Sequence, residues 1–124
     1  MDLTLTIHVE RGPTMIRLFK DRQSPTSYKE FTLAIARDGN EQRHVIPARQ
    51  IQDLLNKIRD AKISPFAEGD LGLDGTAYEL LFEDGLSSVA YKWWMSPGAG
   101  WEALAEIAHA VLGLAQRHSH EYLP

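Results

Sequence analysis

Residues 76–94 read "TAYELLFEDGLSSVAYKWW", two alternating runs that meet at Asp84-Gly85. An Asp-Gly pair between alternating apolar residues is typical of a type I′ hairpin, because both central residues of that turn need a positive φ. The stretch therefore predicts an antiparallel hairpin with a two-residue loop. Placing Asp84 and Gly85 in the loop predicts three facing pairs on the core side: Tyr78 with Tyr91, Leu80 with Val89, and Thr76 with Trp93.

The second face of this hairpin is predicted to point away from the core, because neighbouring strand residues point to opposite faces. Trp93 is then the core tryptophan. The outward face groups three side chains, Glu79, Lys92 and Trp94, as a candidate protein interface. A large aromatic left in water favours association with another protein. An alternative, in which Trp94 is covered by its own chain, stays open.

The first 46 residues predict four further strands. Leu3, Leu5 and Ile7 alternate with polar residues at a period of two, which is the strand pattern. Turns are expected at Gly12-Pro13 and at Asp38-Gly39-Asn40, with a loop over 21–27. Ile16 and Leu18 continue this alternation in a second strand, and Phe31, Leu33 and Ile35 show it in a third. Residues 42–46 are predicted to return as a short fourth strand.

Two helices complete the pattern. Pro47 suits the first turn of a helix, and the apolar residues of 51–58 recur at i, i+3, i+4 and i+7 before Ser64-Pro65 ends the segment. A last helix is predicted over about 100–117. The order ββββ-α-ββ-α predicts a single α+β domain over 1–124, with an antiparallel sheet of about six strands and both helices packed on one face.

Composition excludes several classes of protein. The 124 residues are 44% hydrophobic and 24% charged, which is ordinary for a globular chain. There is no cysteine for a disulfide or a thiolate site, and no apolar run approaches the roughly 18 residues of a membrane span. Seventeen acidic residues against thirteen basic ones leave a net charge of −4. That balance argues against nucleic-acid binding and is compatible with a basic protein partner. The start of the chain lacks a signal peptide, so a cytoplasmic location is expected.

Residues 98–103, "GAGWEA", fit the dinucleotide-binding pattern G-x-G-x-x-A. In such a unit the helix leads to a second parallel strand, and an acidic residue about 20 positions on holds the ribose. Here the helix runs nearly to the end of the chain and "RHSHEYLP" follows, which is no strand. We therefore interpret Gly98 and Gly100 as turn residues. A helix N-terminus still attracts anions weakly, which keeps open an alternative function there.

Other candidate chemistry is incomplete. Glu106-x-x-His109, with Glu102 one turn earlier, has the spacing of a di-iron site but lacks the second pair and the facing glutamates. His118-x-His120 offers two imidazoles, too few for a closed metal site. No catalytic, cofactor or metal residue is predicted. The remaining candidates are interpreted as follows: His8 on the polar side of its strand, His44 as a partly buried structural histidine, and Ser87, Ser88 and Ser96 outside any nucleophile elbow.

One pattern resembles known proteins. "GLDGTAYEL" (72–80), "YKWWMSP" (91–97) and "GW" (100–101) before a final helix are similar to a pattern, LDGTxY…WWxxP…GW, of small uncharacterised bacterial proteins. Some of these resemble immunity proteins of polymorphic toxin systems. The resemblance covers about residues 71–115 and implies a bacterial domain that binds another protein.

These observations predict a cytoplasmic, non-enzymatic domain of bacterial origin that binds either another protein, for which its net charge suits a basic partner, or a second copy of itself. An immunity-like or chaperone-like role fits its acidity and small size. Type III secretion chaperones are also small and acidic but typically begin with a helix, whereas this chain begins with a strand. The alternative function is a small-ligand or anion-binding domain, or an enzyme, that uses the helix N-terminus around Gly98–Gly100. No cofactor, nucleic acid or membrane is expected as a partner.

Overall fold

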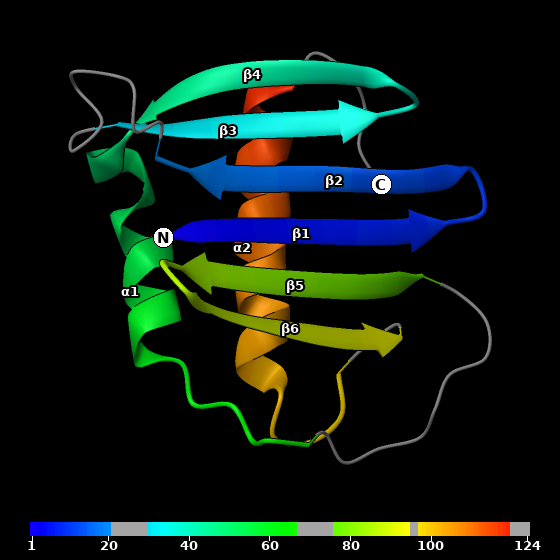
Figure 1. Cartoon of the computed structure of the whole chain (residues 1–124), viewed down its shortest axis with the longest axis vertical. Helices are drawn as coiled ribbons and strands as arrows, with labels where there is room; N and C mark the ends of the chain where they lie inside the picture. The colour runs from blue at the N-terminus through cyan, green and yellow to red at the C-terminus, as the bar shows by residue number, and fades with distance from the viewer. Residues whose placement is uncertain (21–29, 67–75, 95–96, 120–124) are drawn as a thin grey trace.

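A computed structural model describes residues 1–20, 30–66, 76–94 and 97–119, and in them the predicted α+β fold is confirmed (Figure 1). The chain forms a six-stranded antiparallel sheet and two α-helices in the predicted order. The strands are β1 (Asp2–Val9), β2 (Gly12–Phe19), β3 (Glu30–Arg37), β4 (Asn40–Pro47), β5 (Ala77–Asp84) and β6 (Ser87–Trp94). The helices are the 3₁₀ turn η1 (Ala48–Ile51), α1 (Gln52–Asp60) and α2 (Glu102–His118).

The strand order across the sheet is β4-β3-β2-β1-β5-β6. The first strand of the chain therefore lies inside the sheet, between β2 and β5, and pairs antiparallel with both. Among the described strands, β4 and β6 form the two edges of the sheet (Figure 1).

Both helices lie behind the sheet in Figure 1, so they cover one face of it, as predicted. The alternating apolar side chains of the strands point to that face, including Leu5, Ile16 and Leu80, which are fully buried. The helix α2 buries one stripe against them: Leu104, Ile107, Ala108, Val111, Leu114 and Ala115. Each large aliphatic side chain removed from water stabilises the fold by about 1.5–3 kcal/mol.

Of the two turns predicted in the first half of the chain, one is confirmed and the other is wrong. Asp38 and Gly39 both have positive φ, 52° and 80°, between paired Arg37 and Asn40, which is the pattern of a type I′ turn. The turn expected at Gly12-Pro13 is wrong. Val9 pairs with Gly12, so the loop residues are 10 and 11, and Gly12 begins β2 with φ 112°.

The predicted register of the last hairpin is also wrong, by two residues. The loop consists of Gly85 and Leu86, and of these only Gly85 has a positive φ, 60°, as a type II′ turn requires at its first central position. The observed core-side pairs are Tyr78 with Trp93, Leu80 with Tyr91, and Phe82 with Val89. Because every partner shifts by an even number of residues, each side chain keeps the face that the sequence predicts for it.

The predicted first helix begins later than expected. Pro47 ends β4, the η1 turn follows, and α1 begins at Gln52 and ends at Asp60. In the described parts of the chain, no helix has the length and apolar character needed to cross a membrane. The loop predicted over 21–27 and the connector 67–75 lie outside the described residues.

Candidate functional site

The face of the sheet opposite the helices, here called the open face, carries the three candidate interface residues. Glu79 and Lys92 are directly paired across β5 and β6, with 3.8 Å between Lys92 Nζ and Glu79 Oε2. Trp94, two residues after Lys92 on β6, is paired with Ala77 of β5. The structure therefore groups Glu79, Lys92 and Trp94 at the end of the open face where β6 ends.

The exposed fractions of the two adjacent tryptophans show which of them lies in the core. Trp93 is 7% exposed on the helix-covered face, and its ring stacks on Tyr78 with 5.7 Å between centroids. Trp94 is 43% exposed on the open face. The prediction that Trp93 is the core residue is confirmed.

The surroundings of Trp94 combine a small residue with the ion pair of Glu79 and Lys92. Its neighbour across the pair is Ala77, and on the same side of β6 Lys92 lies two residues earlier and Ala90 four residues earlier. Two other large apolar side chains of the open face, Met15 and Val45, are 45% and 64% exposed. Alternation in β2 and β4 indicates these two as outward-facing, but the sequence analysis did not single them out.

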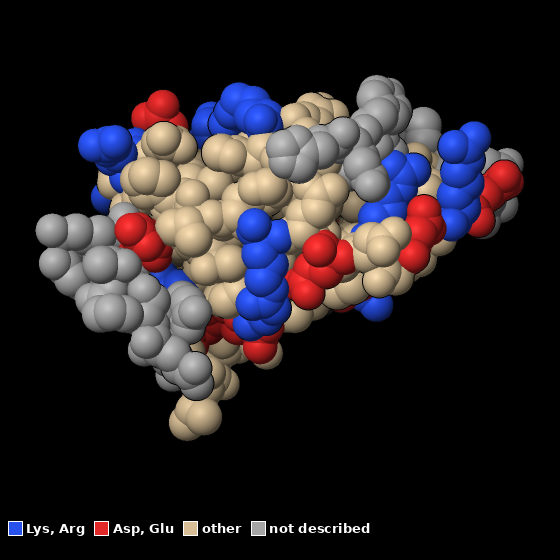
Figure 2. Space-filling model, turned by 90° about the horizontal axis from the view of Figure 1, so that it is seen from above, with Lys and Arg blue, Asp and Glu red and all other residues tan. Residues whose placement is uncertain are grey.

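Several charged side chains elsewhere on the surface form ion pairs with their neighbours. Figure 2, which looks onto the molecule from the β4 side, shows Lys and Arg interspersed with Asp and Glu. Along β4, Arg43 Nε lies 3.4 Å from Glu41 Oε1. Pairs of this kind between exposed side chains contribute about 0–1 kcal/mol each. The side of the molecule seen in that view therefore has no large surface of a single charge.

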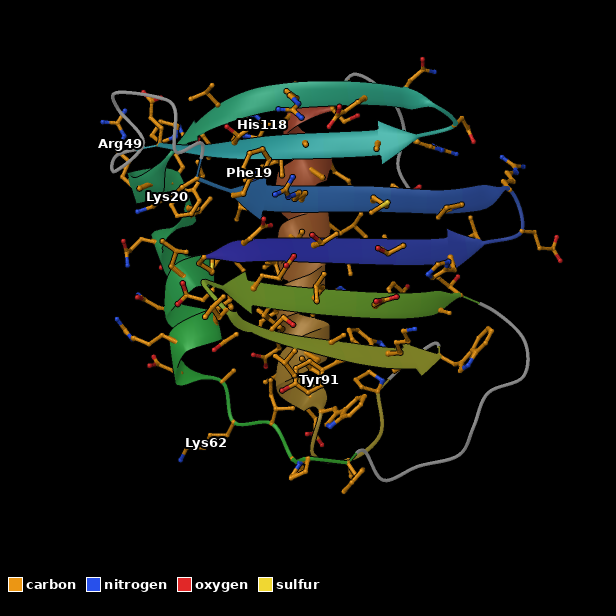
Figure 3. All side chains as sticks on the ribbon, viewed as in Figure 1. Phe19, Lys20, Arg49, Lys62, Tyr91 and His118 are labelled. Carbon is orange, nitrogen blue, oxygen red and sulfur yellow. The ribbon has the colours of Figure 1, made fainter. Side chains whose placement is uncertain are left out.

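A second group on the open face was not predicted. Arg17 donates two hydrogen bonds from Nε to the Asp2 carboxylate, at 3.1 and 3.2 Å, and its guanidinium lies 4.2 Å from the centre of the Phe19 ring. Hydrogen bonding to Asp2 raises the pKa of Arg17 above its ordinary value. Phe19 lies at the end of β2 remote from the end of β6 (Figure 3). The charges of Arg17 and Asp2 thus pair with each other, and this group lies far from Trp94 on the sheet.

The glycines of the 98–103 segment have a packing role. Gly100 has φ 94°, and a Cβ there would lie 2.6 Å from Ser64 Oγ. The Ser64 amide donates to the Gly100 carbonyl at 3.1 Å, and the Trp101 indole donates to the Ser64 carbonyl at 2.8 Å. The segment is thus held against the chain that follows α1. This contact requires glycine at position 100.

The start of α2 is occupied by a carboxylate of its own helix. The backbone N–H of Gly100 donates to Glu102 Oε2 at 3.0 Å. A bound phosphate at this N–H would have to displace Glu102 and would lie beside its negative charge. The local geometry therefore disfavours the anion-binding alternative at Gly98–Gly100.

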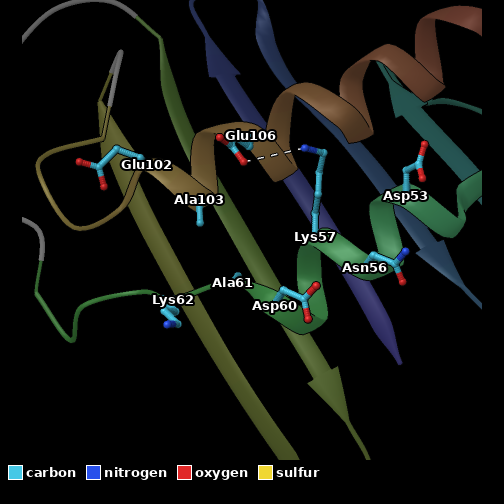
Figure 4. Close-up of a pocket in the computed structure, with 9 residues that line it drawn as sticks. All are labelled: Asp53, Asn56, Lys57, Asp60, Ala61, Lys62, Glu102, Ala103 and Glu106. Carbon is cyan, nitrogen blue, oxygen red and sulfur yellow. Dashed lines mark ion pairs between the residues drawn. The ribbon is translucent and has the colours of Figure 1, made fainter.

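A groove of about 700 Å³ lies between α1 and the first turns of α2 (Figure 4). Lys57 from α1 reaches across to Glu106 of α2, with 3.9 Å between Nζ and Oε2. Four acidic residues and two lysines line the groove together with one amide and two alanines: Asp53, Asp60, Glu102, Glu106, Lys57, Lys62, Asn56, Ala61 and Ala103. Small-molecule sites are mostly apolar, and the acidic excess in this groove repels anions.

NAD and ATP are expected not to bind. The glycines lie in a turn that leads from an antiparallel hairpin, and Glu102 already accepts the hydrogen bond of the Gly100 N–H. Isothermal titration calorimetry of the chain with each nucleotide should give no saturable heat. A micromolar affinity for either one would overturn this interpretation.

The remaining candidates are spread over β1, β4, β6 and α2. Glu106 and His109 are exposed on α2, and His8 is exposed on β1. His44 is half-buried, and its ring lies 5.8 Å from that of His118. Within the described ranges, no three His, Cys, Asp or Glu side chains are grouped as a metal site would need. Ser87 and Ser88 are exposed on β6, whereas Ser96 and His120 lie outside the described residues.

Comparison with known proteins gives no relative. No protein-family model matches the chain, and no curated protein matches it. The resemblance to immunity proteins therefore stays a prediction from the sequence pattern.

Proposed function

We propose that this chain is a cytoplasmic protein-binding domain that holds its partner at the part of the open face formed by Glu79, Lys92 and Trp94. The observation that supports the proposal is the 43% exposure of Trp94 on a sheet face that no described helix covers. Tryptophan is enriched among the residues that dominate binding energy at protein interfaces.

The neighbours of Trp94 suit such a role. Ala77, its neighbour across the strand pair, leaves space beside the indole, so a partner side chain can pack against the ring. The pair formed by Glu79 and Lys92 lies next to the ring and supplies a polar rim. An aromatic anchor surrounded by polar groups is the usual arrangement of an interface centre.

The charge of the chain favours a basic partner. The net charge is −4, and opposite overall charges accelerate the encounter of two proteins. An immunity-like or chaperone-like role in a bacterium would require a binding surface such as the one formed by Glu79, Lys92 and Trp94. It would require no catalytic group. A second copy of the chain is the other candidate partner.

A small-ligand function is the second candidate, supported by the volume of the groove between α1 and α2. The groove falls in the usual range of small-molecule sites, about 300–1,000 Å³. Its acidic lining would suit a cationic ligand rather than a phosphate. We place it second because six of the nine lining residues are charged, whereas small-molecule sites are mostly apolar.

The proposal is tested by the double variant Trp94→Ala, Glu79→Lys. Capture of an identified partner by the tagged chain, measured by quantitative mass spectrometry, should fall at least about tenfold, because truncating an interface tryptophan costs about 2 kcal/mol or more. Self-association, measured by sedimentation velocity, should weaken likewise if the partner is a second copy. The thermal midpoint should stay nearly unchanged.

The matched control is Val45→Ala, Glu41→Lys, which makes the same kinds of change at the β4 side of the sheet. This control should retain the partner. If the midpoint of the first variant drops sharply and capture persists, Trp94 is covered by its own chain and the interface lies elsewhere.

A further inference from the structure

The two edges of the sheet differ in how they are protected against an added strand. Along β4, Glu41 and Arg43 are charged and Pro47 lacks an N–H. Charges and prolines at an edge are the usual means by which proteins prevent strand addition. In contrast, β6 contains no proline and Lys92 is its single charged residue. The β6 edge is therefore the less protected one.

The backbone of β6 presents a regular row of groups to its free side. The pair that closes a two-residue turn, here Asp84 and Ser87, exchanges its hydrogen bonds, and the following pairs alternate. Every second residue thus directs its N–H and C=O away from β5: Ser88, Ala90, Lys92 and Trp94. Outside helices and strand ladders, no backbone hydrogen bond found among the described residues involves these four.

Apolar side chains lie along the same edge on both sides of the sheet. Val89, on the helix side, is 45% exposed, and Trp94 is exposed on the open face. Leu86 in the turn is fully exposed. An extended segment placed beside β6 would cover these side chains while pairing with the row of backbone groups.

From these observations we propose that β6 accepts one extended segment of a partner protein as a seventh strand. The proposal rests on the proposed function and specifies how the partner is held. Main-chain hydrogen bonds would supply affinity, and alternate side chains would supply specificity, as in other cases of strand addition.

A single strand fits this edge better than the β6 of a second copy does. The segments 61–66 and 97–101 lie beyond β6 in Figure 1. Trp101 packs edge-on against Tyr91, whose side chain is on the helix side, with 5.4 Å between ring centroids. If the β6 strands of two copies paired antiparallel, segments 61–66 and 97–101 of one copy would meet the same segments of the other copy at the interface. One extended strand meets only a single copy of these segments.

The charges of the hairpin define the chemistry of the segment. β5 and β6 together carry three acidic residues, Glu79, Glu83 and Asp84, against Lys92 alone. Glu83 is exposed and pairs with the small residue Ser88, so a long basic side chain opposite Ser88 could reach over β6 toward the Glu83 carboxylate. The segment therefore has alternating apolar residues, which cover Val89 and its neighbours, and basic residues on the open face.

The probe is the acetylated and amidated hexapeptide Val-Lys-Val-Lys-Val-Lys. It should bind saturably and slow the hydrogen exchange of the amides of Ser88, Ala90, Lys92 and Trp94 at least about tenfold when saturated, with Glu41 on β4 unchanged. A peptide with Glu in place of Lys should bind at least about tenfold more weakly. A peptide with alternate amides N-methylated should not bind, because it lacks the donors for the new ladder.

The matched protein variants are Ala90→Pro and Glu41→Pro. Each removes an N–H directed away from the sheet, since Glu41 and Ala90 both belong to non-hydrogen-bonded pairs of their hairpins. Ala90→Pro should abolish binding and Glu41→Pro should not. The N-methylated peptide gives the same information on the wild-type chain if Ala90→Pro does not fold.

Strand addition is wrong if the probe fails to bind at millimolar concentration, if the N-methylated peptide binds equally, or if protection appears away from β6. Partner capture separates the two proposals. If Ala90→Pro retains the partner that Trp94→Ala, Glu79→Lys loses, the open face binds the partner without an added strand. If both variants retain it, both proposals fail.

Discussion

Replacing Trp93 with alanine is expected to lower the free energy of unfolding by about 3–5 kcal/mol. The side chain is 7% exposed, and its ring stacks on Tyr78 beneath the sheet. Its removal leaves a cavity in a close-packed core, and the surrounding strands relax only partly to fill it. Equilibrium unfolding in urea measures the loss.

Trp94→Ala is the matched control, because it makes the same change at the next residue of the same strand. Trp94 is on the open face and is 43% exposed, so the variant should lose no more than about 1 kcal/mol. A loss of under about 1 kcal/mol for Trp93→Ala, with a large one for Trp94→Ala, would reverse the assignment of the core tryptophan.

Gly100→Ala should lower the free energy of unfolding by roughly 3 kcal/mol. Two causes contribute. A non-glycine residue at φ 94° costs about 1–3 kcal/mol, and overpacking of the new Cβ against Ser64 costs a similar amount. Urea unfolding again measures the loss, which reports how tightly the segment before α2 is packed on the segment after α1.

The two causes are separable with two further variants. Gly39→Ala introduces a Cβ at φ 80° with no atom within 4 Å, so it should show the backbone cost alone. Ser64→Gly removes the side chain that the new methyl group would meet, so it should restore part of the stability of Gly100→Ala. Equal losses for Gly100→Ala and Gly39→Ala would show that Ser64 moves aside freely.

Alternation along the strands predicted which face each side chain occupies, because that depends only on the period of two. It placed Trp93 inside and Trp94 outside even though the predicted register was wrong. The register depends on which residue begins the turn. At Asp84-Gly85-Leu86 the loop begins at the glycine, whereas at Asp38-Gly39 the aspartate itself adopts a positive φ. The two Asp-Gly pairs look alike in sequence, so local composition did not distinguish them.

The features that sequence analysis missed are contacts between distant parts of the chain. Arg17 and Asp2 meet because β1 and β2 pair, and Ser64 meets Gly100 because two connecting segments cross. The unprotected edge depends on strand order, since β6 is an edge only because β5 pairs with β1. No local pattern specifies that pairing.

The interior place of β1 has a consequence for how the chain folds during synthesis. β1 and β2 are joined by a two-residue turn, as are β3 and β4, and residues 20–29 connect the two hairpins, so these four strands can pair as soon as they leave the ribosome. The other side of β1 must wait for β5, which follows after α1 and a connector, and α2 arrives last to cover the apolar face. Pairing between segments so far apart in sequence is slow. Until residues 77–118 have emerged, the nascent chain exposes both the unpaired edge of β1 and its apolar surface, the combination that makes folding intermediates aggregate.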